Sequence, residues 1–366
     1  MKIIVVNKEK FQNRPPVISV ILTLSDLGHQ VKLITVDINS YWANELEKRG
    51  VETSIVSENG GGGIVGKLVE YRRFKKHTFK ELKNSVEESL VWVIGGNTIL
   101  CLGSNLLKYK FILQIQELQE GEWAFQRLLK KIINKAQLVF MNEYNRAVLY
   151  QCWYSMKKRP VVLPNKPYFI PTFEEMSILR EKYKDKVEAL KGFRIILYQG
   201  HIGYDRDLSS FVKAVKDLGG NYRLLCVGQD HGMIEKYKRI DPNIIHIPHV
   251  PAPDYFVFTS LSYIGIVTYA PRDLNNCYCA PNKIWEYSAF SLPMLCNDIP
   301  GLKYTVESAG AGFCVDDNDF ESIKKGIIKI SEQYSNYQNN AIKFNDSVKT
   351  KDIINAELKR IEMNEN

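Results

Sequence analysis

The sequence predicts an α/β protein with two doubly wound parallel sheets, and three observations support this fold class. The chain has 366 residues, which is too long for one ordinary core and suits two domains of about 150 to 200 residues each. Short apolar runs alternate with helix-length segments, as in repeated βα units. The alternation stops after about residue 163, gives way to a charged stretch, and restarts near residue 194. The chain therefore contains two successive series of βα units.

Residues 1–168 form the expected first domain. Its strands are predicted where apolar and β-branched residues cluster, and helices fill the gaps. The uncharged segment Ser89–Leu107 is nearly long enough to span a bilayer, but a glycine pair interrupts it, so we expect a strand, a turn and a helix. The expected strands are Lys2–Asn7, Gln30–Val36, Thr53–Val56, Leu90–Ile94, Phe111–Gln116, Leu138–Met141 and Val161–Leu163.

Residues 169–192 are predicted to form a charged linker helix, and residues 193–347 the second domain. In the tail we expect helices with breaks at Asn336–Asn340 and around Asp346. Residues 348–366 form a last helix that we expect to cross back to the first domain. The expected strands of the second domain are Arg194–Tyr198, Tyr222–Val227, Ile244–Ile247, Tyr263–Val267, Met294–Cys296 and Gly312–Val315.

Composition indicates a globular protein of the cytoplasm. Hydrophobic residues make up 45% and charged residues 25% of the chain, as in soluble domains. The seven cysteines are scattered, which indicates reduced thiols. Cys277 and Cys279 have the wrong spacing for a zinc site, so we expect no metal. The apolar run Met1–Asn7 is too short for a secretory signal.

The net charge of +8 is concentrated in two basic windows, residues 67–83 and 127–159. Within the second, Arg127, Lys130, Lys131 and Lys135 recur at helical spacing. Two interpretations stay open: a solvated helix face, or adhesion to an anionic membrane, where each cation contributes about 1 kcal/mol. The second predicts a peripheral protein on the inner face of the plasma membrane. Nucleic acid is not an expected partner, because no binding motif is present.

A glycine-rich segment, Gly61–Lys67, has the spacing of a phosphate-binding loop. The residue that follows is Leu68, where such a loop needs a magnesium-coordinating Ser or Thr. We expect a glycine loop at the rim of the domain, and a phosphate-loop NTPase stays open as an alternative.

The segment Ala280–Cys296 carries the clearest chemistry. It is predicted to contain a loop, a helix starting near Pro281, and a buried strand. With Pro281 in the first turn, the amides of Asn282 and Lys283 are free at the positive end of the helix, which is an anion site. Lys283 adds a mobile positive charge, and Glu286 lies one turn further on. This layout suits a nucleoside diphosphate, with the carboxylate toward the ribose hydroxyls.

The run Pro281-Asn282-Lys283-x-x-Glu286-Tyr287 resembles the donor-binding segment of retaining GT-B glycosyltransferases, in the large family 4-like group that builds capsules, exopolysaccharides and O-antigens. Glu286 matches the second of two glutamates that this family places eight positions apart. Tyr278 stands where the first is expected. The resemblance implies two Rossmann-like domains that face an interdomain cleft, the first binding the acceptor and the second a nucleotide sugar.

Two further segments of the second domain resemble parts of the family's donor site. Gly200–Leu208 resembles a phosphate-clamping loop, which makes Gly200 and Arg206 candidate donor contacts. Asp205 is expected to cap the following helix. Val250 follows the third strand, at the edge where related enzymes meet the base through backbone groups. The alternative for each segment is an ordinary connection between a strand and a helix.

In the first domain, Glu117 and Arg14 follow predicted strands. Ligands of open α/β sheets bind at the carboxyl ends of strands. The family often has His-Glu at the position of Gln116-Glu117, so Glu117 is the candidate catalytic residue, while a surface or capping role stays equally open. Arg14 is a candidate acceptor contact or a plain loop residue.

The resemblance implies a hexosyltransferase that moves a sugar from a UDP-linked donor to a lipid-linked or oligosaccharide acceptor in cell-surface polysaccharide synthesis. The helix amides, Arg206 and Lys283 would neutralise the leaving diphosphate, so we expect neither a metal nor a cofactor. Two further alternatives stay open. Because the first glutamate is missing, the chain is also compatible with a catalytically weak scaffold protein of polysaccharide assembly, and a UDP-sugar epimerase shares the same architecture.

Overall fold

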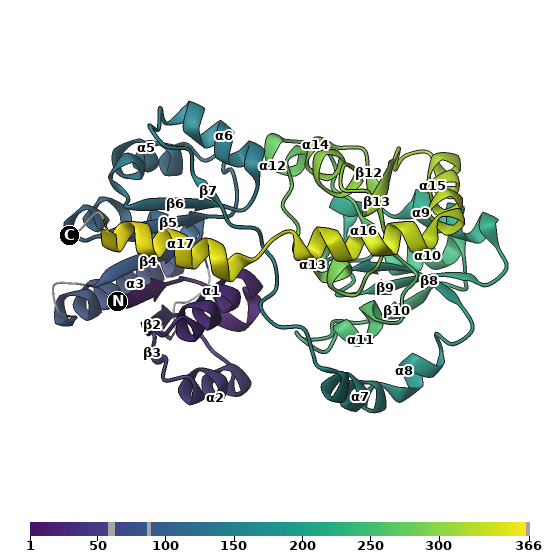
Figure 1. Cartoon of the computed structure of the whole chain (residues 1–366), viewed down its shortest axis with the longest axis horizontal. Coiled ribbons are helices and arrows are strands. Elements are labelled where there is room, and N and C mark those ends of the chain that lie inside the picture. Colours follow the sequence, from purple (N-terminus) through teal and green to yellow (C-terminus); the bar gives the residue numbers. More distant parts are fainter. Residues whose placement is uncertain (58–62, 86–88, 364–366) are drawn as a thin grey trace. The chain divides into compact units, whose positions relative to one another are not determined.

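The computed structural model describes residues 1–57, 63–85 and 89–363. The chain divides into two compact units, labelled by element in Figure 1. The first unit consists of Met1–Tyr168 together with Lys349–Asn366, and the second of Phe169–Val348. The charged segment after residue 168 therefore belongs to the second unit, and the C-terminal helix to the first.

The described residues of the first unit contain a seven-stranded parallel sheet with the order β3-β2-β1-β4-β5-β6-β7. The strand order reverses between β1 and β4, which makes the sheet doubly wound. Every expected strand is present, because buried parallel strands appear in the sequence as continuous apolar runs. The strands are β1 (Lys2–Val6), β2 (Gln30–Thr35), β3 (Glu52–Ile55), β4 (Leu90–Ile94), β5 (Phe111–Ile115), β6 (Leu138–Met141) and β7 (Val161–Val162).

Helices cover both faces of this sheet. One core joins it to α1 (Pro15–Asp26), α2 (Ser40–Lys48) and α17 (Thr350–Met363). The other joins it to α3 (Gly63–Asn84), α4 (Gly96–Leu102), α5 (Trp123–Ile132) and α6 (Tyr144–Trp153). Short 3₁₀ turns occur at η1 (Phe11–Asn13), η2 (Gly103–Lys108) and η3 (Ile133–Lys135). Because each helix follows a parallel strand, α3 to α6 begin near the carboxyl edge of the sheet.

The second unit contains a six-stranded parallel sheet with the order β10-β9-β8-β11-β12-β13. The strand order reverses between β8 and β11, while all strands stay parallel. The expected strands are again all present. They are β8 (Arg194–Gln199), β9 (Tyr222–Val227), β10 (Ile245–Ile247), β11 (Ile264–Val267), β12 (Met294–Asn297) and β13 (Gly312–Val315). The predicted fold class of two doubly wound α/β domains is confirmed.

The helices of the second unit enclose two cores, one on each face of its sheet. They are α7 (Phe173–Lys182), α8 (Lys184–Glu188), η4 (Tyr204–Arg206), α9 (Ser209–Leu218), α10 (Ile234–Ile240), α11 (Phe256–Thr259), α12 (Leu274–Cys277), α13 (Asn282–Ala289), α14 (Pro300–Leu302), η5 (Lys303–Glu307, a π-helix), α15 (Phe320–Glu332) and α16 (Tyr334–Asp346).

One expected helix break is wrong. Asn336–Asn340 lies inside α16, and the breaks fall at Gln333 and at residues 347–349. Tyr337 and Ala341 of α16 are buried in the cores. Their burial outweighs the weak helix preference of the asparagines.

All seven cysteines lie in described residues and none forms a disulfide. Among the described helices, none combines the length and the apolar character that a membrane crossing needs.

Candidate functional site

Two glycines shape the carboxyl edge of the second unit's sheet, one after β8 at the switch point and one after the neighbouring β9. Gly200 follows β8 with φ +129°, and Gly228 follows β9 with φ +148°. A Cβ on Gly228 would lie 1.8 Å from the carbonyl oxygen of Gly200, so no larger residue fits. The backbones of the two loops therefore touch, and this contact fixes the turn that leads from β8 toward Arg206.

Lys283, in the first turn of α13, reaches back to this turn. A Cβ on Gly200 would lie 3.1 Å from Lys283 Cε and 3.3 Å from Nζ. The ammonium group also lies 4.2 Å from the centroid of the Tyr198 ring. Lys283 is only 7% exposed and lies against Gly200 and Tyr198, so the expectation that its positive charge is mobile is wrong.

The Nζ atom of Lys283 is buried and has no hydrogen-bond partner. Burial, together with the positive charge of Arg206, lowers the pKa of Lys283 to about 7. A buried polar group without a partner is costly, and protein interiors normally avoid it. An anion bound here would restore the ammonium form, because an opposite charge nearby raises a lysine pKa.

Glu286 lies one turn further along α13 and is 5% exposed. Its Oε1 accepts a hydrogen bond of 2.8 Å from the Tyr255 hydroxyl, and its Oε2 accepts one of 2.9 Å from Gln199 Nε2. Burial raises the pKa of Glu286, and these two donors and the charge of Lys283 oppose the shift. Each carboxylate oxygen keeps a second lone pair for a further donor.

Arg206, at the end of η4, completes the cationic side of the site. Its guanidinium lies 4.4 Å from the centroid of the Tyr269 ring, on the loop after β11. Burial opposes the charge of Arg206, but the neighbouring Tyr269 and Tyr198 side chains raise its pKa. The nearest carboxylate oxygen of Asp205 is 3.6 Å from Arg206 Nε. Tyrosine rings on both sides of the switch point thus hold this side chain.

The amino-terminal end of α13 has no side-chain cap. Pro281 is the N-cap residue, one position before the first turn where we expected it, and Asn282 begins the helix. Proline has no N–H, so Asn282 carries the first amide of the helix. Without a side-chain cap, the first amides stay available to an anion. Val250, by contrast, packs its side chain into a core, which leaves only its backbone for a base.

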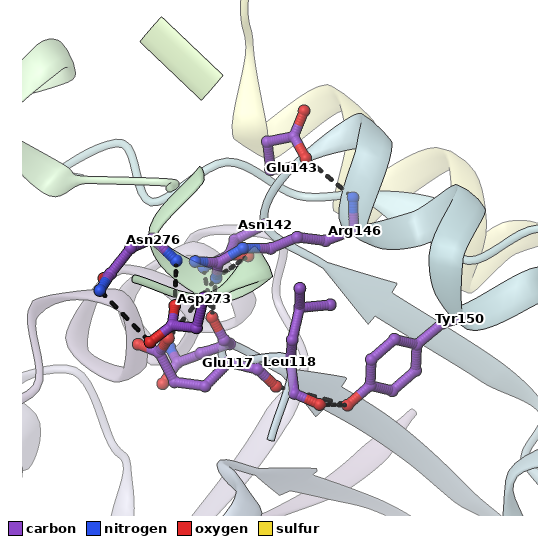
Figure 2. Close-up of polar contacts among 9 residues, drawn as sticks. Glu117, Leu118, Asn142, Glu143, Arg146, Tyr150, Asp273 and Asn276 are labelled. Atoms are coloured by element: carbon purple, nitrogen blue, oxygen red, sulfur yellow. Dashed lines mark hydrogen bonds and ion pairs between the residues drawn. The ribbon is translucent and has the colours of Figure 1, made fainter. Parts of the chain in front are cut away.

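In the first unit, Glu117 follows β5 and is exposed. Figure 2 draws its polar contacts together with those of Arg146 and Tyr150. The loop that carries it is held by the buried Arg146, whose guanidinium donates to the carbonyl of Gln116 and, over 3.2 Å, to Asn142 Oδ1. The Tyr150 hydroxyl donates to the carbonyl of Leu118 over 2.8 Å. Glu117 Oε2 itself lies 3.7 Å from Arg146 Nη1.

Arg14 is the N-cap residue of α1 and forms an ion pair with Glu9. Burial lowers the pKa of Arg14, and the negative charge of Glu117 opposes this shift. Arg14 and Glu117 therefore interact electrostatically at the same edge of the sheet.

The structure brings Gly200, Arg206, Lys283 and Glu286 together and leaves Val250 at the edge of the same sheet. Four side chains that surround them were not predicted from the sequence: Tyr198, Gln199, Tyr255 and Tyr269. Gln199 gave a signal, since it is a polar residue ending a buried strand. The tyrosines gave none, because their roles depend on distant segments meeting.

Two expectations about charged side chains are wrong. Asp205 does not cap α9: that helix has no side-chain cap bond at Leu208, and Asp207 accepts from the Ser209 amide instead. Arg146 belongs to the basic window 127–159 but is only 3% exposed. Its guanidinium donates a hydrogen bond to the loop that carries Glu117 and is not available to a membrane.

Two further features of the described residues concern alternative sites. They contain no group of three or more His, Cys, Asp or Glu side chains arranged to hold a metal ion. Of the glycine segment Gly61–Lys67, the first two residues lie outside the described residues. The remainder forms the start of α3, where Lys67 is exposed.

Comparison with known proteins identifies the fold as GT-B. No protein-family model matches the chain, and none of the curated proteins does. Among solved structures, HepE (Alr3699) of Anabaena in complex with UDP-glucose matches with a TM-score of 0.71 at 11% identity, over 99% of this chain and 100% of HepE. A glycosyltransferase from Rickettsia africae matches with a TM-score of 0.67 at 17% identity, over 99% of this chain and 97% of its own. Sucrose-phosphate synthase from Thermosynechococcus elongatus matches with a TM-score of 0.63 at 14% identity, over 100% of this chain and 97% of its own.

Proposed function

We propose that this protein is a glycosyltransferase that transfers a sugar from a UDP-linked donor. The observation that carries the proposal is the buried, unpartnered ammonium of Lys283, beside Arg206 and an uncapped helix end at a sheet switch point. Such a cluster of positive groups suits the two phosphates of a nucleoside diphosphate. Similar structures of HepE contain UDP or UDP-glucose, which supports uracil as the base.

The proposed chemistry uses these groups on the leaving side of the reaction. As the bond to the sugar breaks, negative charge develops on the diphosphate, and Arg206, Lys283 and the amides of α13 stabilise it. Glu286 accepts hydrogen bonds from the ribose hydroxyls through its spare lone pairs. These residues neutralise the leaving group themselves, so the proposal requires no metal ion.

On the acceptor side, we assign Glu117 to orient or deprotonate the acceptor hydroxyl and Arg14 to contact the acceptor. Glu117 is exposed at the carboxyl edge of its sheet and is held by a buried arginine, which gives it both access and a fixed position. We propose a lipid-linked or oligosaccharide acceptor in cell-surface polysaccharide synthesis, such as a capsule, and a peripheral location on an anionic membrane.

Calorimetry with UDP tests the donor site. We expect Glu286→Ala to weaken UDP binding by roughly 1 to 3 kcal/mol, the scale of hydrogen bonds to a charged group. Since Glu286 also holds Tyr255 and Gln199, urea unfolding of the variant must show that it remains folded. Glu235→Ala, at an exposed position of α10, is the matched control. If Glu286→Ala binds UDP as the wild type does, Glu286 does not contact the nucleotide.

Incubation with UDP-sugars in the absence of an acceptor separates the remaining alternatives. A transferase slowly transfers the sugar to water and thereby releases UDP. An epimerase converts one UDP-sugar into another, and a scaffold protein binds the UDP-sugar unchanged. A thermal-shift screen across nucleotide sugars selects the donor for this assay.

A further inference from the structure

Helix α3 carries three aliphatic side chains on its outward face, where a helix of a globular protein is normally polar. Val65 is 74% exposed, and Leu68 and Val69 are also exposed. At 100° per residue these three lie on the side of α3 opposite Phe74, which is buried in the core. The inner face of α3 therefore packs in the core of the first unit, and a second apolar surface faces outward.

Basic residues continue the same outward ridge. Arg72 and Lys76 follow Val65, Leu68 and Val69 at intervals of three and four, so they extend one stripe along the helix. Neither has an ion-pair partner among the described residues. The carboxylate of Glu81, in contrast, is neutralised by Lys32 at 2.6 Å. The ridge is thus apolar in its first turns and positively charged behind them.

Helix α5 repeats this arrangement at its own amino-terminal end. Trp123 is 71% exposed, and the Arg127 guanidinium lies 5.5 Å from its ring centroid. Lys130, Lys131 and Lys135 follow on exposed positions. Tryptophan beside cations is the pattern that proteins show where a membrane meets water.

Helices α3 and α5 are both in contact with elements around α4. Tyr71 of α3 donates a hydrogen bond to Asn97 of α4, and Gly96 of α4 is backed by the side chain of Gln119, on the loop before α5. Because α3 follows β3 and α5 follows β5 in one parallel sheet, both helices begin at the carboxyl edge. Val65, Leu68, Val69 and Trp123 are thus exposed apolar side chains at that edge, carried by two separate helices, and we call these four side chains the apolar rim.

We propose that this apolar rim inserts into the headgroup region of an anionic lipid surface, while Arg72, Lys76, Arg127 and the lysines of α5 contact lipid phosphates. Charge complementarity selects this partner, since the cations lie directly behind the apolar side chains. Arg14 and Glu117 follow β1 and β5 and share the edge that carries the rim. The inference rests on the proposed function, because a rim inserted in the membrane would bring a lipid-linked acceptor to the acceptor side of the enzyme.

Vesicle flotation of the full chain tests the proposal, with vesicles of phosphatidylcholine and phosphatidylglycerol at roughly three to one. We expect the wild type to float with these vesicles. The triple variant Val65→Ser, Leu68→Ser, Val69→Ser should bind about tenfold more weakly or worse. The matched control is Phe173→Ser with Ile178→Ser, which removes similarly exposed apolar side chains from α7 of the second unit. The control should float like the wild type.

Fluorescence separates insertion from simple charge attraction. The chain has five tryptophans, so the difference between the wild type and Trp123→Phe isolates the signal of Trp123. We expect this signal to shift to the blue when anionic vesicles are added. Absence of the shift, failure of the wild type to float, or a triple variant that floats like the wild type would overturn the proposal. UDP calorimetry without vesicles reports on the donor site alone, so its outcome is independent of these results.

Discussion

Raising the pH should weaken UDP binding, and Lys283 should be the cause. Burial lowers the pKa of Lys283 to about 7, against an ordinary value of 10.5. In the free protein the amine therefore loses its proton as the pH rises above about 7. A diphosphate beside it favours the ammonium and raises the pKa again. Binding must then take up a proton, and a reaction that takes up a proton weakens as the pH rises.

The size of the effect follows from the two pKa values. If the bound diphosphate returns the lysine to its ordinary pKa, each pH unit between the two values costs about 1.4 kcal/mol, or a factor of about ten in Kd. From about pH 7.5 to 9.5 the affinity for UDP should fall roughly 100-fold. The terminal phosphate of UDP, with a second pKa near 6, is already ionised throughout this range and adds no slope.

Isothermal titration calorimetry measures both the slope and its origin. Repeating the titration near pH 8.5 in buffers of different ionisation enthalpy counts the protons taken up, and we expect about one. Lys283→Met should bind UDP weakly, with no dependence on pH. Lys303→Met, at an exposed position, is the control and should keep the wild-type slope. A Kd that does not change with pH in the wild type, or an unchanged slope in Lys283→Met, would refute the reasoning.

Three further predictions concern packing. Gly200→Ala should lower UDP affinity about tenfold in calorimetry, because φ is +129° and the new Cβ meets Lys283 at 3.1 Å; an unchanged Kd would contradict this. Arg146→Met should lower the free energy of unfolding in urea by about 2 to 4 kcal/mol, since Asn142 Oδ1 loses its donor and the Gln116 carbonyl keeps only the donor from Asn142; with Arg159→Met, an exposed position, as the control, equal losses would argue against a buried role. Leu358→Ala in α17 should cost about 2 to 5 kcal/mol in the same assay, and a loss near zero would mean that α17 does not pack on the first unit.

The fold was predictable because it depends on local patterns. In a parallel sheet covered on both faces, each strand is an apolar run and each helix an amphipathic segment, so both can be recognised from a window of residues. The tail shows where this approach fails. Asparagines at 336, 339 and 340 indicate a break locally, but burial of Tyr337 and Ala341 keeps α16 continuous.

The candidate site was predictable only in part, for the same reason. Lys283 and Glu286 lie in one short helix, and their spacing places them within one turn of each other. The partners of Glu286 come from residues 199 and 255, far away in the chain. That Lys283 is buried follows from its packing against Gly200, a contact between the loop after β8 and α13 that no sequence window contains.

The pairing within α13 is itself an argument for a ligand. Lys283 and Glu286 are both buried and one turn apart, and in a helix built only for stability their charges would bond to each other. Instead, Glu286 takes its hydrogen bonds from Tyr255 and Gln199, while the Lys283 ammonium has no hydrogen-bond partner. The hydrogen bonds from Tyr255 and Gln199 hold the carboxylate of Glu286 away from Lys283. The ammonium group of Lys283 therefore stays available to bind an anion. Substituting Tyr255 by Phe should therefore free Glu286 to pair with Lys283, raise the lysine pKa and flatten the pH dependence of UDP binding.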